Sequence, residues 1–115
     1  MKSIHGESFQ IRLDETSLTL CFKGALRLTG AEDYASILEM LRGVLTAPHA
    51  RVLLDIRELD FLNSSGIAML SRFVIEARER NKVNVQFLGS LSVPWHARSL
   101  KNLQRLMPSL SVELA

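Results

Sequence analysis

The segment Val52-Leu-Leu-Asp-Ile-Arg-Glu-Leu-Asp-Phe-Leu-Asn-Ser-Ser-Gly-Ile-Ala-Met-Leu70 carries the clearest structural pattern in this chain of 115 residues. It opens with the apolar run Val52–Ile56, which is typical of a strand covered on both faces. Residues Arg57–Leu62 read as a loop, and apolar residues at helical spacing then predict a helix over about residues 64–80. A buried strand followed by an amphipathic helix indicates an α/β fold.

The residues upstream predict a hairpin and a helix. The runs Phe9–Leu13 and Leu18–Phe22 alternate apolar with polar residues across the polar link Asp14–Ser17, as the two strands of a β-hairpin do. Thr29-Gly-Ala-Glu32 matches a capping box, in which the Thr hydroxyl and the Glu carboxylate each accept a hydrogen bond from a free backbone amide. A helix is therefore expected over about residues 31–46.

The residues downstream predict a strand, a helix and a last strand. Residues 83–87 alternate apolar with polar side chains and indicate a strand that ends near Gly89. Ser92 can cap a helix that has Pro94 in its first turn. This helix would bury Leu100, Leu103 and either Leu106 or Met107 against the core. It would end at Pro108, and a last strand would follow over Leu110–Leu114.

The predicted order of elements mixes an antiparallel hairpin with strand–helix–strand units, which favour parallel pairing. We therefore expect one domain over residues 1–115. Its fold class would be α/β, with a mixed β-sheet, an N-terminal hairpin and three or four helices packed against the sheet. A chain of this length can bury one hydrophobic core without help from disulfides or metals.

Composition excludes several classes of protein. The 14 basic residues against 12 acidic ones give a net charge of +2, which is too weak to indicate nucleic-acid binding. Arg98, Lys101 and Arg105 share one predicted helix face, which we interpret as a solvated face or a surface for an acidic partner. The lone Cys21 excludes a disulfide framework, and neither a signal peptide nor a membrane-spanning stretch is evident, so we expect a soluble, cytoplasmic protein.

The motifs of common enzymes are missing from the sequence. His5, His49 and His96 lie in separate predicted elements, without a spacing that would place metal ligands on one face. No phosphate-binding loop, dinucleotide fingerprint or nucleophile elbow occurs. We therefore expect a protein that is not an enzyme and that has neither a metal site nor a cofactor.

The turn Asn63-Ser64-Ser65-Gly66 is the candidate functional site. It follows the most buried predicted strand, and loops at the carboxyl ends of strands in α/β sheets are exposed and rigidly held. Asn63 is a good N-cap, and the two serines would occupy the first helical turn. Backbone amides there lack helical partners, so a phosphate on a first-turn hydroxyl would be electrostatically favoured.

The segment Val52–Leu70 resembles the central signature of STAS domains, the module shared by sulfate transporters and bacterial anti-sigma factor antagonists. That signature is a hydrophobic strand ending in Asp, a short loop, and then Asp-Ser-Ser-Gly-aliphatic at the start of a helix. The strand, the spacing and the Ser-Ser-Gly all match here. Phe22-Lys-Gly-Ala-Leu-Arg-Leu28 looks like the family's second-strand segment, and Arg98–Pro108 looks like a small STAS-like branch found in bacteria.

This resemblance implies signal transduction by partner switching. In stand-alone members of the family, the first Ser of the motif is phosphorylated by an ATP-binding serine kinase that doubles as an anti-sigma factor, and a serine phosphatase removes the phosphate. The resemblance therefore implies that Ser64 is the phosphoacceptor, with Ser65 as the alternative. It also implies that Asn63, Ser64, Ser65 and Gly66 bind the kinase-type partner while Ser64 is unphosphorylated.

Two positions depart from the family pattern. Asn63 stands where the family has Asp, which keeps the helix cap and removes a negative charge. Ala25 stands where the second-strand segment usually has Glu. Two other functions remain open at this point: a constitutive STAS scaffold in which Ser64 and Ser65 only cap the helix, and a domain that senses a nucleotide or another small anion.

Overall fold

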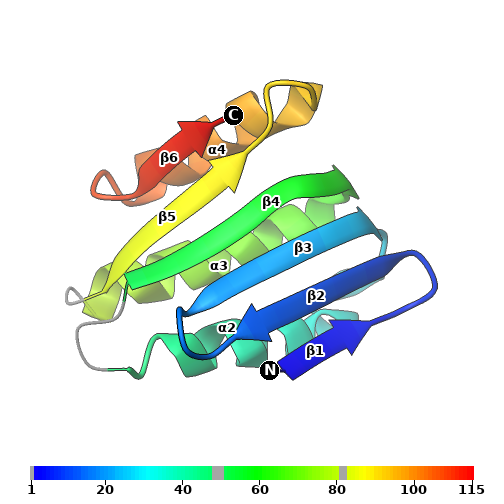
Figure 1. Ribbon diagram of the computed structural model, residues 1–115, viewed down its shortest axis with the longest axis horizontal. Coiled ribbons are helices and arrows are strands. Elements are labelled where there is room, and N and C mark those ends of the chain that lie inside the picture. The colour runs from blue at the N-terminus through cyan, green and yellow to red at the C-terminus, as the bar shows by residue number, and fades with distance from the viewer. Residues whose placement is uncertain (1, 48–50, 81–82) are drawn as a thin grey trace.

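The computed structural model describes residues 2–47, 51–80 and 83–115 as one six-stranded sheet with helices (Figure 1). Neighbouring strands follow the order of the chain, β1-β2-β3-β4-β5-β6. The strands are β1 (Lys2–His5), β2 (Phe9–Asp14), β3 (Thr19–Leu26), β4 (Arg51–Leu62), β5 (Asn84–Gly89) and β6 (Ser111–Leu114). The β1–β2 and β2–β3 pairs are antiparallel and the other three pairs are parallel, so the expected mixed sheet with an N-terminal hairpin is confirmed.

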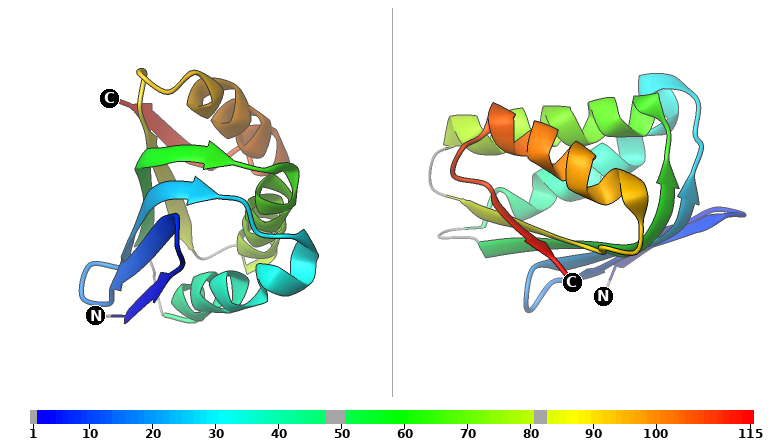
Figure 2. Two further views of the ribbon diagram at one scale, coloured as in Figure 1. Left: turned by 90° about the vertical axis from the view of Figure 1, so that its right-hand side faces the viewer. Right: turned by 90° about the horizontal axis from the view of Figure 1, so that it is seen from above.

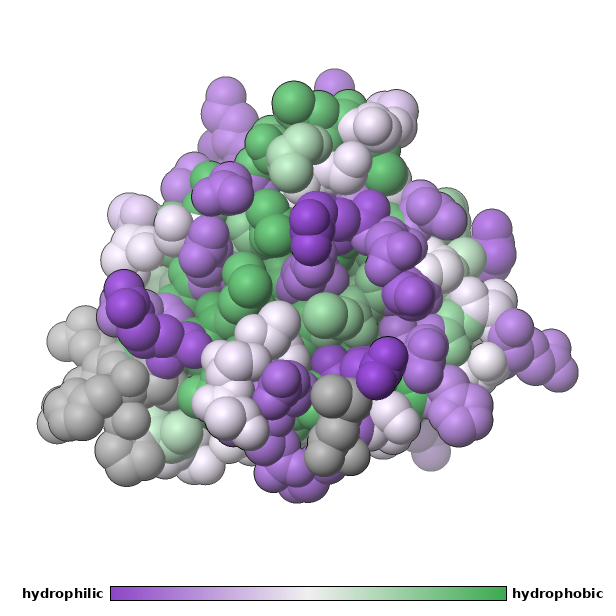
Figure 3. All heavy atoms as spheres, viewed as in Figure 1, coloured by the Kyte–Doolittle hydropathy of each residue, from purple (hydrophilic) through white to green (hydrophobic). Residues whose placement is uncertain are grey.

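All the helices lie on one face of the sheet (Figure 2). They are α1 (Gly30–Asp33), α2 (Ala35–Val44), α3 (Ser64–Arg80) and α4 (Pro94–Leu106). The opposite face, shown in Figure 3, presents polar and charged side chains mixed with apolar ones to solvent. Among the described helices, none combines the length and apolar character needed to cross a membrane.

The hydrophobic core fills the space between the sheet and the helices. Strand β4 supplies inward side chains at every second position over its first half, and these are almost fully buried. Helix α3 meets them with an apolar stripe. The buried side chains of these two elements are Val52, Leu54, Ile56, Leu59, Leu62, Met69, Leu70, Phe73, Val74 and Ala77. Because β4 and α3 are both fixed by this core, the turn between them is held in one place.

The predicted loop over Arg57–Leu62 is wrong, because β4 continues to Leu62. Its buried positions change from every second residue to every third, at Ile56, Leu59 and Leu62. The pairing of β3 with β4 shifts register at two points along this half of the strand. Such irregularities insert an extra residue and re-aim the side chains that follow. They break the period-2 pattern that would have predicted a strand.

The helix predicted over residues 31–46 is interrupted at Tyr34, which separates α1 from α2. The capping box is also wrong, because the side chain of Thr29 makes no capping hydrogen bond. The carboxylate of Asp33, one residue beyond Glu32, instead accepts a hydrogen bond from the Thr29 amide at 3.3 Å. The interruption lets the Tyr34 ring turn into the core, where it is 1% exposed.

The C-terminal elements largely follow the prediction. Leu100, Leu103 and Met107 are buried, and β6 follows the turn after Met107. The N-cap of α4 is Val93 rather than the predicted Ser92, with Pro94 in the first turn as expected. Strand β1 was not predicted, because it is short, mostly exposed and paired only with β2 among the described strands.

Candidate functional site

Asn63 is the N-cap of α3, as predicted, and its side chain joins three segments of the chain. Its Oδ1 accepts hydrogen bonds from the Gly66 amide at 2.9 Å and from the Tyr34 hydroxyl at 2.7 Å. Its Nδ2 donates to the Leu28 carbonyl at 2.7 Å. The helix start is thereby fixed to the end of the β3 connection and to the α1–α2 junction.

These contacts explain why Asn fits where the STAS signature has Asp. The Leu28 carbonyl needs a donor, which an amide supplies and an ionised carboxylate lacks. The Tyr34 hydroxyl is a donor to Asn63, and burial raises the pKa of Tyr34, so its hydroxyl keeps its proton. The departure at Asn63 is therefore matched by the polar groups around it.

Gly66 allows α3 to start close to the neighbouring elements. A Cβ at this position would overlap the Leu62 side chain and lie 2.9 Å from the Tyr34 hydroxyl oxygen. Real Cβ atoms essentially never come that close to a heavy atom. Gly66 is thus required by packing, which a capping preference alone would not indicate.

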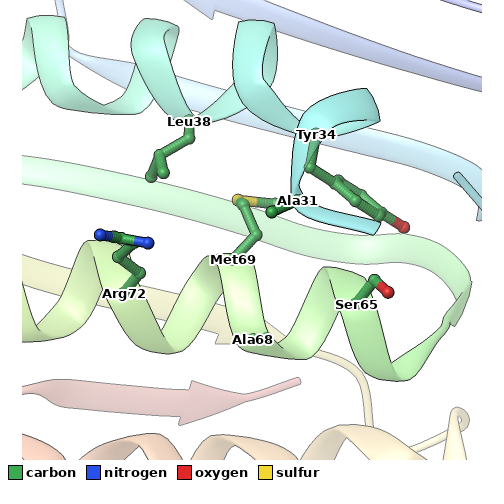
Figure 4. Close-up of a pocket in the computed structure, with 7 residues that line it drawn as sticks. All are labelled: Ala31, Tyr34, Leu38, Ser65, Ala68, Met69 and Arg72. Atoms are coloured by element: carbon green, nitrogen blue, oxygen red, sulfur yellow. The ribbon is translucent and has the colours of Figure 1, made fainter. Parts of the chain in front are cut away.

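The two serines face different surroundings. Ser64, the first residue of α3, is exposed, and no hydrogen bond to its hydroxyl occurs within the described parts of the chain. Ser65 is half-buried, and its hydroxyl lies on the side of α3 that faces Tyr34 (Figure 4). Because Asn63 supplies the capping hydrogen bond, the reading in which these serines cap the helix is wrong.

Two large apolar side chains near Ser64 in the sequence are exposed. Phe61 is 40% exposed and Ile67 is 37% exposed, three residues before and three residues after the serine. The guanidinium of Arg27 lies over the Phe61 ring, 4.7 Å from its centroid, at a distance that suits a cation–π contact. The Trp95 indole donates a hydrogen bond of 2.9 Å to the Asp60 carbonyl and so ties α4 to this end of β4.

A hollow of about 160 Å³ lies beside the serine turn, between α3 and the α1–α2 segment (Figure 4). Leu38 from α2 and Met69 from α3 point toward one another across it, and Arg72 stands at the end away from Ser65. Its lining is Ala31, Tyr34, Leu38, Ser65, Ala68, Met69 and Arg72. This hollow could not be predicted from the sequence, because its walls come from two segments, Ala31–Leu38 and Ser65–Arg72, that are far apart along the chain.

Among the histidines, His96 is part of the protein core. His96 is fully buried, with Nδ1 accepting a hydrogen bond from the Ser90 amide and Nε2 donating to the Leu59 carbonyl. His5 is exposed on β1, and His49 lies outside the described residues. Over residues 2–47, 51–80 and 83–115, no group of three or more His, Cys, Asp or Glu side chains could hold a metal ion.

The helices on one face of a mixed sheet, with a serine turn at the carboxyl end of the central strand, define a STAS-like α/β fold. One similar chain belongs to the crystal structure of the diguanylate cyclase SiaD in complex with its activator SiaC from Pseudomonas aeruginosa. The match covers 100% of both chains, with a TM-score of 0.74 and 14% sequence identity.

Two structures of SiaC from the same organism are also similar to this chain. The first matches with a TM-score of 0.66 and the second, the crystal structure of apo-SiaC, with 0.63. Each is 17% identical, and the matches cover 100% of this chain and 97% and 98% of those chains. At these identities the likeness establishes the fold. No protein-family model and no curated protein sequence matches the chain.

Proposed function

We propose that this protein is a non-catalytic, protein-binding regulator, similar to anti-sigma factor antagonists, that phosphorylation of Ser64 switches. The observation that carries the proposal is the exposed Ser64 at a fixed helix start, with exposed Phe61 and Ile67 three residues before and after it in the sequence. Exposed large apolar side chains near a reachable hydroxyl supply apolar area that a partner protein can bury when it binds. The partner is an ATP-binding serine kinase of the anti-sigma type, and a serine phosphatase resets the switch.

A phosphate on Ser64 would change this surface strongly and locally. It adds roughly −1.5 to −2 units of charge at pH 7. The first-turn amides of α3 favour that charge in the free protein, while an apolar partner surface over Phe61 and Ile67 would have to desolvate it. Phosphorylation therefore stabilises the unbound form and weakens the complex. Each tenfold loss of affinity needs only about 1.4 kcal/mol.

The similar solved structures support a role in protein binding. One of them is a complex in which SiaC is the activator of an enzyme, the diguanylate cyclase SiaD. The match to that structure covers the whole of both chains. We therefore expect a protein partner for this chain too. The capture experiment described below can also identify a partner enzyme that direct binding regulates.

The hollow beside Ser65 is by itself too small to enclose a nucleotide. Its volume is about 160 Å³. Pockets that bind nucleotides and other small molecules usually measure about 300–1,000 Å³. The constitutive scaffold differs from the proposed switch only in its response to changes at Ser64, so the same experiment separates the two.

The test is affinity capture from the source cell with wild type, Ser64→Ala and Ser64→Glu compared side by side. The matched control is Ser36→Glu, which changes an exposed serine in the first turn of α2. We expect wild type, Ser64→Ala and Ser36→Glu to recover an ATP-binding protein that Ser64→Glu recovers poorly. Equal recovery with all four proteins would favour the scaffold and contradict the switch.

A further inference from the structure

Arg27 is a surface arginine at the end of β3, close to the serine turn. Its guanidinium lies over the Phe61 ring, 4.7 Å from the ring centroid. Within the described residues, this guanidinium makes neither an ion pair nor a hydrogen bond. Arg42 and Arg57, by contrast, each bind a carboxylate at 2.8 Å. Because Arg27 is also exposed, its N–H donors are available to a new anionic partner.

Strand pairing places Arg27 next to the serine turn. Strands β3 and β4 pair in parallel as far as Leu26 and Leu62, and their ends rise together toward the helices (Figure 2). The Asn63 amide donates a hydrogen bond of 3.2 Å to the Leu26 carbonyl. The Asn63 side chain donates one of 2.7 Å to the Leu28 carbonyl. Asn63, the residue before Ser64, is thus bound to the residues on both sides of Arg27.

The separation of the two residues suits a contact between an arginine and a phosphate. Neighbouring strands lie about 4.8 Å apart and consecutive Cα atoms about 3.8 Å apart, so the Cα atoms of Arg27 and Ser64 lie within roughly 9 Å. A phosphate lengthens the serine side chain, and the arginine side chain is long and flexible enough to meet it. The Ser64 hydroxyl has no hydrogen bond within the described parts of the chain, so no contact of its own would be broken.

The contact with Phe61 is the interaction that Arg27 would give up. A cation–π contact at an exposed site is weak. The pair formed by a guanidinium and a phosphate is bidentate and charge-assisted, which makes it one of the stronger polar contacts in proteins. A phosphate within reach of Arg27 would therefore displace the Phe61 ring as its partner.

We propose that Arg27 binds the phosphate of phosphorylated Ser64 within the same chain and leaves the Phe61 ring when it does so. The inference rests on the proposed function in one respect, because it takes Ser64 as the residue that carries the phosphate. Phosphorylation then changes two features of the docking surface at once. It neutralises the Arg27 cation, and it uncovers one face of the Phe61 ring.

The test uses the full chain with phosphoserine installed at position 64 during synthesis, so that no kinase is needed. Arg27→Gln removes the cation, and Arg27→Lys keeps the charge without the bidentate geometry. The matched control is Arg80→Gln, which removes an exposed cation at the last residue of α3, roughly 24 Å from Ser64 at 1.5 Å per residue. Circular dichroism and thermal melts establish that each variant folds.

Phosphorus NMR follows the second ionisation of the phosphate, which ordinarily has its midpoint near pH 6. We expect this midpoint to lie about 0.5 pH lower in wild type than in Arg27→Gln, because an adjacent cation favours the dianion. Arg27→Lys should lie between the two, and Arg80→Gln should match wild type. The Nε–H resonance of Arg27 should also shift when position 64 carries phosphate, as a hydrogen bond to the phosphate requires.

Equal midpoints in wild type and Arg27→Gln, or an Arg27 Nε–H resonance that the phosphate leaves unchanged, would overturn the inference. Failure of the phosphorylation switch is measured separately, as partner affinity that does not change with phosphate on Ser64. If docking is lost while the midpoints are equal, the switch stands and the role of Arg27 is wrong. If the midpoints differ while docking persists, Arg27 binds the phosphate and the switch is wrong.

Discussion

Asn63 shows how one side chain can set the geometry of a candidate site. Its amide accepts from a backbone amide and from a buried hydroxyl, and it donates to a carbonyl from another segment. Only a side chain with both a donor and an acceptor can satisfy this set. This network holds the helix start that carries Ser64, and the Ser64 hydroxyl takes no part in it.

Asn63→Asp, which introduces the acidic residue of the STAS signature, should therefore destabilise the protein. The new carboxylate keeps the cap but leaves the Leu28 carbonyl without its donor, at a cost of about 1–2 kcal/mol for a partly buried acceptor. Chemical denaturation near pH 7 measures the difference. The control Asn84→Asp, at an exposed position of β5, should change stability by less than about 0.5 kcal/mol. Equal stability of the two variants would contradict the assigned network.

Glycine to alanine substitutions at two helical positions should have opposite signs. Gly43→Ala in α2 meets open space and should stabilise the protein by about 0.5–1 kcal/mol, through helix propensity. Gly66→Ala forces a Cβ against Leu62 and Tyr34 and should destabilise it by about 1–3 kcal/mol, through overpacking. Thermal or urea unfolding of both variants checks the pair. A stabilising Gly66→Ala would show that α3 does not start as close to Tyr34 as described.

At the residue level, the sequence predicts the features that depend only on residues close together in the chain. The N-cap role of Asn63 follows from the residue type and its place before a helical pattern. The contact between Tyr34 and Asn63 does not, because it depends on how the α1–α2 segment packs on α3. A buried tyrosine needing a partner for its hydroxyl is the one signal that could have indicated such a contact.

At the level of elements, an ion pair holds α2 against α3. Arg42 forms a bidentate ion pair with Glu76. Its Nε donates a hydrogen bond to Oε1 and its Nη2 donates one to Oε2, each at 2.8 Å. Hydrogen bonds from Arg42 are the main reason why the pKa of Glu76 lies below its usual range. This contact links α2 directly to α3.

The ion pair predicts a pH dependence of stability. Because the pKa of Glu76 is lower in the folded than in the unfolded state, its stabilising contribution is complete above about pH 4.5, the ordinary value, and is lost as pH falls through the folded-state pKa. The stability gap between wild type and Glu76→Gln should therefore be largest near neutral pH and shrink in acid. Denaturation at pH 7 and pH 3 measures the gap. Exposed Glu79→Gln is the control, and a gap for Glu76→Gln that does not depend on pH would contradict the assignment.

Element boundaries were predictable where the apolar period was regular. Helix α3 and the β2–β3 hairpin follow their patterns closely, because each buries one face against the core. The second half of β4 did not follow, since its pairing with β3 is irregular and its buried residues fall at every third position. The break at Tyr34 could not be predicted either, because the apolar residues keep their helical spacing through it.

On the scale of the whole molecule, all helices on one side leave the other face of the sheet in solvent (Figures 2 and 3). The serine turn then stands at one end of the layered structure, where β4 gives way to α3. The α/β class and the mixed sheet follow from the order of elements, but the hollow beside Ser65 does not. Its shape depends on how α3 packs against the α1–α2 segment, which the order of elements does not determine.

In the function that we propose, phosphate on Ser64 reverses partner docking. The most direct measurement is the equilibrium affinity of the captured kinase-type partner for one preparation of the protein, before and after enzymatic phosphorylation, with the modified residue mapped by mass spectrometry. We expect phosphate at Ser64 and an affinity at least tenfold weaker, a change of about 1.4 kcal/mol. Full phosphorylation of Ser64 with unchanged affinity, or no phosphate at either Ser64 or Ser65, would contradict it.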